Sequence, residues 1–576
     1  MNPATALATV LVDELVRHGV RDAVLCPGSR SAPLAFALKA ADDDGRLRLH
    51  VRTDERSAAF LALGLAKGSN RVVAVVTTSG TAVANLHPAV LEASHTGVPL
   101  LLLTADRPPE LRGTGANQTT RQVSIFGDAV RWQHDLGVPD DRPGQVTTWR
   151  STVSRAVLAA TAARGGFAGP VHLNLPLREP LVPERGTAFT QTFGGRADGA
   201  PWTSARAVPA PPPPSPWWPS SPDDGRTLVL VGDLPAAAPG RTDWGAAAAG
   251  LAESQGWPVV AEPSSAGAWA RALAGGSLLL ACDDWLDQHR PDRVVVVGRV
   301  TLARPVARLL RDDRVRVDLV SDDPVWPDPA GRVRQVLPLR ALADAEILTS
   351  EPATTPWLAA WQRASEAVSA ATCTARQRQW PTGIAVAATV LESLAGDSTL
   401  VVGSSNAVRD LDLVGGGRGP AVTANRGLAG IDGLLSTACG VALTTDRPTY
   451  ALVGDLTFAH DAAALQVGPS EPRPDLTIVV VNDDGGGIFT LLEPGEPEHS
   501  ETFERVFGTP LGLDLASLCG ATGTPHVLVQ SPDQLRAELS SPPSGLRVLE
   551  VRVDRAGHRE ARERLRDAAV AALAHL

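Results

Sequence analysis

Lysine is nearly absent from this chain of 576 residues. Of its 53 basic residues only Lys39 and Lys67 are lysine, and the rest are arginine. A pyridoxal Schiff base would have to use one of these two side chains, and no Gly-Lys-Ser/Thr sequence supplies a Walker lysine. Lysine-based covalent catalysis and P-loop nucleotide hydrolysis are therefore disfavoured.

Cysteines are few, and long apolar runs are missing. The five cysteines are scattered without a Cys-x-x-Cys pair, which argues against a disulfide framework or structural zinc and fits a reducing cytoplasm. Asp13 and Glu14 interrupt the first apolar stretch, which predicts an amphipathic helix and not a signal peptide. The longest apolar strings, such as Val98–Thr104, fall far short of the ~20 residues of a membrane span. We expect a cytoplasmic protein without membrane insertion.

An excess of positive charge is also lacking. The formal net charge of -10 argues against nucleic-acid or anionic-membrane partners, which need a basic surface. With 44% hydrophobic and 20% charged residues, the composition is that of a globular chain. At about 100–200 residues per domain, three or four domains are expected.

Short apolar runs alternate with longer amphipathic stretches, which is typical of parallel α/β units. The runs fall into three sets, each long enough for one sheet. The first holds Leu47–Val51, Val72–Thr77, Pro99–Thr104 and Val171–Leu175; the second Thr227–Val231, Pro258–Ala261, Arg293–Val297 and Arg314–Leu319; the third Thr399–Val402, Tyr450–Val453 and Leu476–Val481. We predict an α/β fold with three doubly wound parallel-sheet domains.

Two breaks separate these sets. The proline-rich stretch Ala207–Asp224 is predicted to be an extended linker. The second break, Glu351–Thr355, precedes a helix that carries Trp357 and Trp361. The predicted domains are 1–190, 200–350 and 356–576.

Several common catalytic fingerprints are missing. No predicted strand is followed by Gly-x-Gly-x-x-Gly, and neither Gly-x-Ser-x-Gly nor His-Glu-x-x-His occurs. None of the 12 histidines sits in a ligand-spaced pair, so individually they are expected to be structural or on the surface. Rossmann hydride transfer, serine hydrolysis and zincin chemistry lose their usual support.

The strongest positive signal lies in the third set of strands. Gly454-Asp455-Leu456 follows one strand, and 26 residues later Asn482-Asp483 follows the next. Ligands of open α/β sheets bind at the carboxyl ends of strands, and hard oxygen ligands of this kind suit Mg²⁺ beside a diphosphate. Gly485, Gly486 and Gly487 would let the backbone approach such an anion closely. The alternative is that Asp455 and Asn482 simply cap two helices.

This pair and its separation resemble the signature of thiamin diphosphate enzymes, Gly-Asp-Gly followed by Asn-Asn. The chain departs from it at Leu456 and Asp483. The resemblance implies thiamin diphosphate with Mg²⁺, or Mn²⁺ as an alternative ion. The implied metal ligands are Asp455, Asn482 and a backbone carbonyl near Asp484, with Gly454, Leu456 and Gly485 beside the cofactor.

Enzymes of this class hold the aminopyrimidine with a glutamate in another domain. Glu55 follows the predicted strand Leu47–Val51, and Thr78 lies in the segment that follows the next strand. By resemblance, Glu55 is catalytic and Thr78 binds the cofactor. A carboxyl group that must stay protonated has to be desolvated, so we expect Glu55 to be shielded from water. The alternative is a first-turn acid that stabilises its helix.

Further segments narrow the resemblance to one family. They are Cys26–Leu34, Leu103–Glu110, Gly115–Gln118, Ser404–Asp410, Asn425–Gly433 and Gly486–Phe489. They are similar to the 2-succinyl-5-enolpyruvyl-6-hydroxy-3-cyclohexene-1-carboxylate synthases of menaquinone biosynthesis. The likeness spans the first and third domains, whereas the central domain matches only in outline. It implies decarboxylation of 2-oxoglutarate and conjugate, Stetter-like addition of the succinyl carbanion to isochorismate.

Both implied substrates are dicarboxylates, which arginine binds in bidentate fashion. By resemblance, Gln118 is catalytic and also binds substrate, Ile431 wedges the cofactor, and Ile488 lies beside it. The other implied substrate-binding residues are Ser29, Arg30, Arg107, Asn117, Arg304, Arg409, Arg426, Phe489 and Leu492. The alternative for any single arginine is a surface ion pair of ~0–1 kcal/mol.

Other functions remain open at this stage. An acetolactate synthase or benzoylformate decarboxylase type would use the same cofactor site, but Arg30, Arg409 and Arg426 do not suit an apolar substrate. An inactive scaffold or metabolite sensor could keep the fold, although Glu55, Asp455 and Asn482 are intact. The central sheet could bind a nucleotide or metabolite, but without a glycine fingerprint a structural role is favoured. A homodimer or homotetramer with the cofactor at the subunit interface is implied by resemblance.

Overall fold

The computed structural model describes residues 1–184, 189–205, 225–234, 242–342, 352–377, 379–417 and 419–576. These residues form three sheets in two compact units. The first unit comprises Met1–Pro209, Asp432–Thr445 and Asp461–Pro474; the second comprises Ala210–Ile431, Asp446–His460 and Asp475–Leu576. The whole predicted linker Ala207–Asp224, and Glu351 of the second break, lie outside the described residues, and the predicted domain boundaries stay a prediction.

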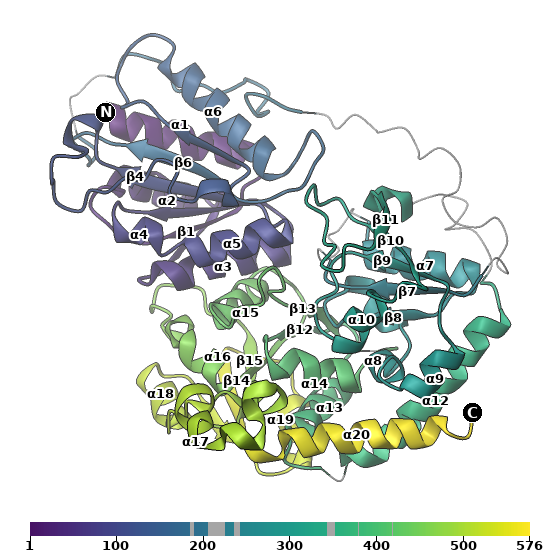
Figure 1. Cartoon of the computed structure of the whole chain (residues 1–576). Helices are drawn as coiled ribbons and strands as arrows, with labels where there is room; N and C mark the ends of the chain where they lie inside the picture. Colours follow the sequence, from purple (N-terminus) through teal and green to yellow (C-terminus); the bar gives the residue numbers. More distant parts are fainter. Residues whose placement is uncertain (185–188, 206–224, 235–241, 343–351, 378, 418) are drawn as a thin grey trace. The chain divides into compact units, whose positions relative to one another are not determined.

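The first unit contains a parallel sheet in the order β2-β1-β3-β4-β6-β5. Figure 1 shows α1 and α6 on one face of it and α3 and α5 on the other. The strands are β1 Asp22–Leu25, β2 Arg48–Val51, β3 Val73–Thr77, β4 Leu100–Asp106, β5 Trp132–Asp135 and β6 Val171–Pro176. The helices are α1 Pro3–Arg17, α2 Ala32–Asp43, α3 Glu55–Ser69, α4 Thr81–Ala84, α5 His87–Thr96 and α6 Gln145–Ala160.

A helix from late in the sequence, α15 (Leu434–Ala442), completes the first unit by packing along α3. Glycines make this approach possible at backbone distance. A Cβ atom at Gly64 would lie 2.1 Å from the carbonyl oxygen of Thr437, and one at Gly440 would lie 2.3 Å from that of Leu61. Any larger residue at either glycine would push the two helices apart.

The central sheet, in the second unit, is parallel with the order β11-β10-β9-β7-β8. Its strands are β7 Thr227–Val231, β8 Val259–Ala261, β9 Arg293–Val297, β10 Arg316–Val320 and β11 Val333–Leu337. Its helices are α7 Trp244–Gln255, α8 Gly276–Leu279, α9 Asp283–Gln288 and α10 Arg304–Leu309. The predicted helix with Trp357 and Trp361 is present as α12, Pro356–Gln377.

The third sheet is also parallel, in the order β13-β12-β14-β15-β17-β16. Its strands are β12 Thr399–Val402, β13 Ala421–Thr423, β14 Thr449–Gly454, β15 Leu476–Asn482, β16 His526–Leu528 and β17 Leu546–Arg552. Its helices are α13 Gly383–Ser393, α14 Asn406–Val414, α16 Asp455–His460, α17 Ser500–Phe503, α18 Leu515–Ala521, α19 Pro532–Leu539 and α20 His558–Leu573. The buried apolar runs of β14 and β15 lie at its centre, so their carboxyl ends open side by side.

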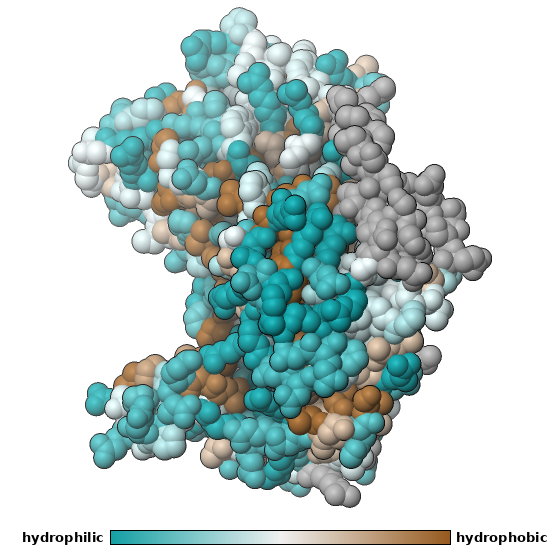
Figure 2. Space-filling view, turned by 45° about the vertical axis from the view of Figure 1, so that its right-hand side comes forward, coloured by the Kyte–Doolittle hydropathy of each residue, from teal (hydrophilic) through white to brown (hydrophobic). Residues whose placement is uncertain are grey.

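The prediction of an α/β fold with three parallel sheets is confirmed. Each predicted strand is present, and β1, β5, β11, β13, β16 and β17 are added to them. Within the described residues, no helix combines the length and the apolar character needed to cross a membrane. Hydrophilic residues cover most of the face in Figure 2, and hydrophobic residues form smaller patches on it.

Candidate active site

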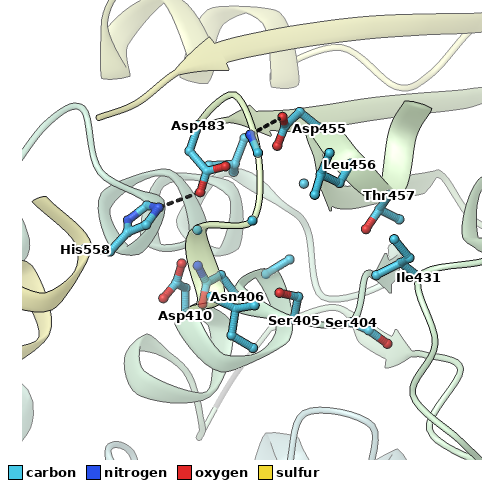
Figure 3. A pocket seen from close by; sticks show the side chains of 18 of the residues that line it. Ser404, Ser405, Asn406, Asp410, Ile431, Asp455, Leu456, Thr457, Asp483 and His558 are labelled. Atoms are coloured by element: carbon cyan, nitrogen blue, oxygen red, sulfur yellow. Dashed lines mark hydrogen bonds and ion pairs between the residues drawn. The ribbon is translucent and has the colours of Figure 1, made fainter. Parts of the chain in front are cut away.

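A pocket lies at the carboxyl end of the third sheet (Figure 3). Asp455 and Asp483, from the ends of β14 and β15, lie on one side of it, and Ser404, Ser405 and Asn406, which follow β12, lie on the opposite side. Parallel strands that end at one edge thus place two polar walls face to face, and Asp410 lies beside Asn406 on the second. The predicted cofactor and substrate residues that line this pocket are Ile431, Gly454, Asp455, Leu456, Gly485, Ile488 and Phe489.

Asp455 is the first residue of α16 and is buried, with 7% of its surface exposed. Its Oδ2 accepts a hydrogen bond of 2.8 Å from the backbone N–H of Gly485. Burial, and next the negative charge of Asp483, raise the pKa of Asp455. Two carboxylates so placed need a proton or a cation between them.

The side chain that faces Asp455 is Asp483 and not the predicted Asn482. Strand β15 includes Asn482, whose Nδ2 donates to Glu550 at 2.8 Å and whose Oδ1 accepts from the N–H of Asp484 at 3.0 Å. Asp483 lines the pocket, whereas the carboxylate of Asp484 accepts from the N–H groups of Leu511 and Gly512 at 3.1 and 2.9 Å. The buried acidic pair of the pocket is therefore Asp455 and Asp483.

The glycines after β15 are required by close contacts. Gly485 has φ +143°, and a Cβ atom there would lie 1.9 Å from the carbonyl oxygen of Gly508. A Cβ atom at Gly487 would lie 1.8 Å from Oδ2 of Asp483. A side chain at either position would displace the loop that carries Asp483.

Ser404 was not singled out from the sequence as a site residue. Its side chain is buried, lines the pocket, and among the described residues its Oγ has no hydrogen-bond partner. Buried hydroxyl groups are rarely left unpaired, so this one is suited to an oxygen atom of a ligand. Its signals in the sequence were its place just beyond the apolar run of β12 and in the segment Ser404–Asp410.

Two predicted substrate arginines, Arg409 and Arg426, lie close to each other in the second unit. Burial, followed by the charge of Arg426, lowers the pKa of Arg409, whose guanidinium donates to the carbonyl of Ser405 at 2.7 Å. Arg426 is buried, and its Nε has no hydrogen-bond partner among the described residues. Two neighbouring guanidinium groups, with the Nε–H of Arg426 available as a donor, can bind an anion.

The central sheet supports Arg426. An Nη atom of Arg426 donates to Oγ1 of Thr301 at 2.7 Å. The N–H groups of Thr301 and Leu302 in turn donate to Oε1 of Glu262 at 2.6 and 2.8 Å, directly after β8. Burial raises the pKa of Glu262 to about 7. The predicted central residue Arg304 is exposed and pairs with Glu493 at 3.1 Å, and Leu492 is absent from the pocket lining.

In the first unit, Glu55 is the first residue of α3, which Asp54 caps by accepting from the N–H of Ser57 at 2.8 Å. Burial raises the pKa of the Cys26 thiol to about 12, and the charge of Glu55 contributes to that rise. Glu55 therefore stands near the carboxyl ends of β1 and β2. It is half-buried in this chain, so the expected shielding from water stays a prediction.

Ser79, which was not predicted as a site residue, connects two predicted residues, Gln118 and Arg107. It donates from Oγ to the carbonyl of Gln118 and accepts at its own carbonyl from Nε2 of Gln118, both at 2.9 Å. The guanidinium of Arg107 also bonds to its Oγ. The neighbouring Thr78 is buried against Gly28, where a Cβ atom would lie 2.3 Å from Cβ of Thr78.

The remaining predicted residues of the first unit are half-buried or exposed to solvent. Arg30 donates to the carbonyl of Leu177 at 3.0 Å, and burial followed by the charge of Arg107 lowers its pKa. Ser29 and Asn117 are exposed. The first unit thus presents a polar, positively charged group of side chains near the ends of β1, β3 and β4.

Comparison with known proteins identifies the family of this chain. The sequence model of the thiamine pyrophosphate enzyme N-terminal TPP-binding domain matches residues 5–125. A 2-succinyl-5-enolpyruvyl-6-hydroxy-3-cyclohexene-1-carboxylate synthase of Saccharopolyspora erythraea is 50% identical over 100% of both chains. Two further synthases of this name are also similar to the chain. That of Kineococcus radiotolerans is 48% identical over 100% of both chains. That of Rhodococcus erythropolis is 47% identical over 97% of this chain and 98% of its own. The chain belongs to the 2-succinyl-5-enolpyruvyl-6-hydroxy-3-cyclohexene-1-carboxylate synthase family.

Proposed function

We propose that this chain is a thiamin diphosphate-dependent carboligase that decarboxylates 2-oxoglutarate and adds the remaining succinyl unit to isochorismate. Carbon dioxide is released, and the product is the 2-succinyl compound for which the family is named, in menaquinone biosynthesis. The observation that carries the proposal is the buried pair Asp455 and Asp483 beside a glycine loop, in a chain up to 50% identical to synthases of this name.

Asp455 and Asp483 fit a Mg²⁺ ion, or Mn²⁺, because two buried carboxylates on one side of a pocket need a hard cation to balance them. A backbone carbonyl of the segment from Asp484 to Gly485 would add a third ligand. This ligand set replaces Asn482, whose amide group is engaged by Glu550. The unpaired hydroxyl of Ser404 and the glycine loop suit the diphosphate.

When bound, thiamin diphosphate supplies a thiazolium ring that stores the electron pair left by decarboxylation. The chain's own groups position it and move protons. Glu55 would hold a proton against a ring nitrogen of the pyrimidine, and Thr78 would bind the same part of the cofactor. Ile431, Leu456 and Ile488 give the pocket an apolar wall that excludes water from the reacting centre.

Arg409 and Arg426 are proposed to hold substrate carboxylates, because Arg426 is buried and the half-buried Arg409 lies close to it. The other proposed substrate contacts are Ser29, Arg30, Arg107, Asn117, Gln118 and Phe489, with Gln118 also in the catalytic step. Arg304 is a weaker candidate, since Glu493 already neutralises it at an exposed position. We further propose a cytoplasmic homodimer or homotetramer in which each cofactor contacts two chains, as the resemblance implies.

The test measures carbon dioxide release from 2-oxoglutarate with thiamin diphosphate and Mg²⁺, with and without isochorismate. We expect slow release alone, faster release with isochorismate, and formation of the 2-succinyl product by mass spectrometry. Release from an apolar 2-keto acid, with none from 2-oxoglutarate, would contradict the substrate assignment. Light scattering of the purified chain would report the oligomer.

A further inference from the structure

The start of the C-terminal helix α20 is bound to the loop that carries Asp483. The 3-10 turn Arg555–Gly557 precedes it, and the guanidinium of Arg555 donates to the backbone carbonyls of Asp483, at 3.0 Å, and Asp484. One turn into α20, Arg562 donates to the carboxylate of Asp410 at 2.5 Å. Residues three or four positions apart share one helix face, so this face of α20 is turned toward the pocket.

His558 lies between these two arginines and contacts the pocket carboxylate directly. Its Nε2 is 2.6 Å from Oδ2 of Asp483, and the two side chains are only 7% and 9% exposed (Figure 3). When Asp483 is ionised, as a metal-binding carboxylate must be, it can only accept, so Nε2 of His558 donates the hydrogen. His558 also lines the pocket, so the histidine and the aspartate form one buried wall.

The space for this pair is provided by Gly487. A Cβ atom there would lie 1.8 Å from Oδ2 of Asp483 and 2.8 Å from Nε2 of His558. The third glycine of the loop is therefore required by the histidine–aspartate contact. Without His558, Oδ2 of Asp483 would lose the donor that fixes its orientation beside the like-charged Asp455.

We propose that His558 is a positioning residue that holds the Asp483 carboxylate in its metal-binding orientation, so that the C-terminal helix completes the metal site. The inference rests on the proposed metal pair Asp455 and Asp483. Hydrogen-bond partners of ligating carboxylates typically contribute 10- to 100-fold in metal affinity. The loss of His558 should therefore weaken the metal and leave the rest of the pocket in place.

The experiment measures Mn²⁺ binding to the full-length protein with saturating thiamin diphosphate, by the electron paramagnetic resonance signal of free Mn²⁺. We expect His558→Ala to raise the Mn²⁺ dissociation constant about 10- to 100-fold. His558→Gln keeps an N–H donor and should restore most of the affinity. Arg564→Ala, on an exposed Arg564–Glu560 pair of the same helix, is the matched control and should bind Mn²⁺ like the wild type.

The outcomes separate two failures. If the wild-type protein binds no Mn²⁺ in the presence of thiamin diphosphate, the proposed metal site itself is wrong. If the wild type binds Mn²⁺ and His558→Ala binds it equally well, only the role of His558 is refuted. An equal loss in the Ala and Gln variants, with circular dichroism spectra like the wild type, would also refute a hydrogen-bonding role.

Discussion

The central and third sheets contain the same five residues at the end of a strand and use them differently. Leu-Val-Gly-Asp-Leu occurs at 230–234, after β7, and again at 452–456, after β14. Both strands are buried and lie inside a parallel sheet. Only the second copy lines the described pocket.

The difference lies in what faces each copy. After β7, the N–H of Asp233 donates to the carbonyl of Arg299 at 2.9 Å, and the N–H of Arg299 donates to the carbonyl of Asp233 at 3.3 Å. The segments that follow β7 and β9 are therefore paired with each other. A Cβ atom at Gly232 would lie 2.1 Å from that carbonyl oxygen of Arg299. After β14 the chain turns at once into α16, and a Cβ atom at Gly454 would meet no atom within 4 Å. The carboxyl end of a strand can form a binding site when no neighbouring segment of the chain packs against it.

The two sheets also neutralise a buried acid differently. Glu262, after β8, accepts two backbone N–H groups, and its pKa is raised to about 7, so it can take up a proton near neutral pH. Asp455 accepts one N–H group and faces a second carboxylate, which favours a cation. The central sheet is thus built to hold Thr301 in place, and the third to bind a ligand.

The largest expected effect separates the two copies of the pentapeptide. Asp455→Ala should weaken Mg²⁺-dependent binding of thiamin diphosphate roughly 100-fold or more, because a hard ligand and its charge are lost. Asp233→Ala, the same change in the central copy, should leave this affinity unchanged. Isothermal titration calorimetry measures both. Equal affinities for Asp455→Ala and the wild type would place the diphosphate elsewhere.

The second effect concerns the arginines near the pocket. Arg426→Ala should lower kcat/KM by roughly ten- to over a hundredfold and spare cofactor affinity, because a charge-assisted hydrogen bond contributes ~1.5–3 kcal/mol. Arg426→Lys should rescue only in part, since an ammonium group lacks the planar fork. Steady-state kinetics with each substrate varied in turn identifies the carboxylate involved. Unchanged kcat/KM for both substrates would refute the dicarboxylate pocket.

A smaller effect tests whether the central sheet supports Arg426. Thr301→Val removes the oxygen that accepts from Arg426 but keeps the shape of the side chain. A hydrogen bond of about 0.5–1.5 kcal/mol corresponds to a rise in KM of roughly 2- to 12-fold. Thr301→Ser keeps the hydroxyl and should behave like the wild type. If Val and Ser variants have the same KM, the central sheet does not act through this contact.

The last effect is on stability and depends on pH. Burial raises the pKa of Glu262 from 4.5 to about 7. As pH rises from about 4.5 to about 7, the carboxyl group therefore loses its proton in the unfolded chain but keeps it in the folded one. Glu262 thus makes folding less favourable as pH rises through this range. Glu262→Gln keeps the accepting oxygen without the charge. Its melting temperature relative to the wild type should rise between pH 5 and pH 8, by up to the equivalent of roughly 3 kcal/mol. The exposed Glu253→Gln is the control, and a pH-independent difference for Glu262→Gln would contradict this reasoning.

The strands of the third sheet could be predicted because β14 and β15 are buried apolar runs that end in polar residues. The residue that enters the pocket could not. The sequence suggested a strand ending at Val481, but β15 continues to Asn482, which pairs with Arg552 of β17. Since side chains alternate along a strand, this one extra residue turns Asn482 toward Glu550 and leaves Asp483 for the pocket.

Other features lacked any local signal. The edge strands β5 (Trp132–Asp135) and β11 (Val333–Leu337) are partly exposed, so their sequences contain polar residues and no buried run. His558 contacts Asp483 across 75 residues of sequence, and the burial of the Ser404 side chain in the pocket is set by the packed fold. Such contacts depend on the tertiary fold, which short-range patterns do not encode.

The packing of α15 against α3 has a consequence for how the protein is made. The face of α3 that carries Gly64 is covered by a helix that leaves the ribosome long after residue 209, and the segment Asp461–Pro474, also part of the first unit, is later still. At about 5–20 residues per second, roughly ten to fifty seconds of synthesis pass before this face can be covered. During this time the apolar face of α3 in the nascent N-terminal region is exposed and can bind chaperones. A fragment that stops at residue 209 would keep this face exposed.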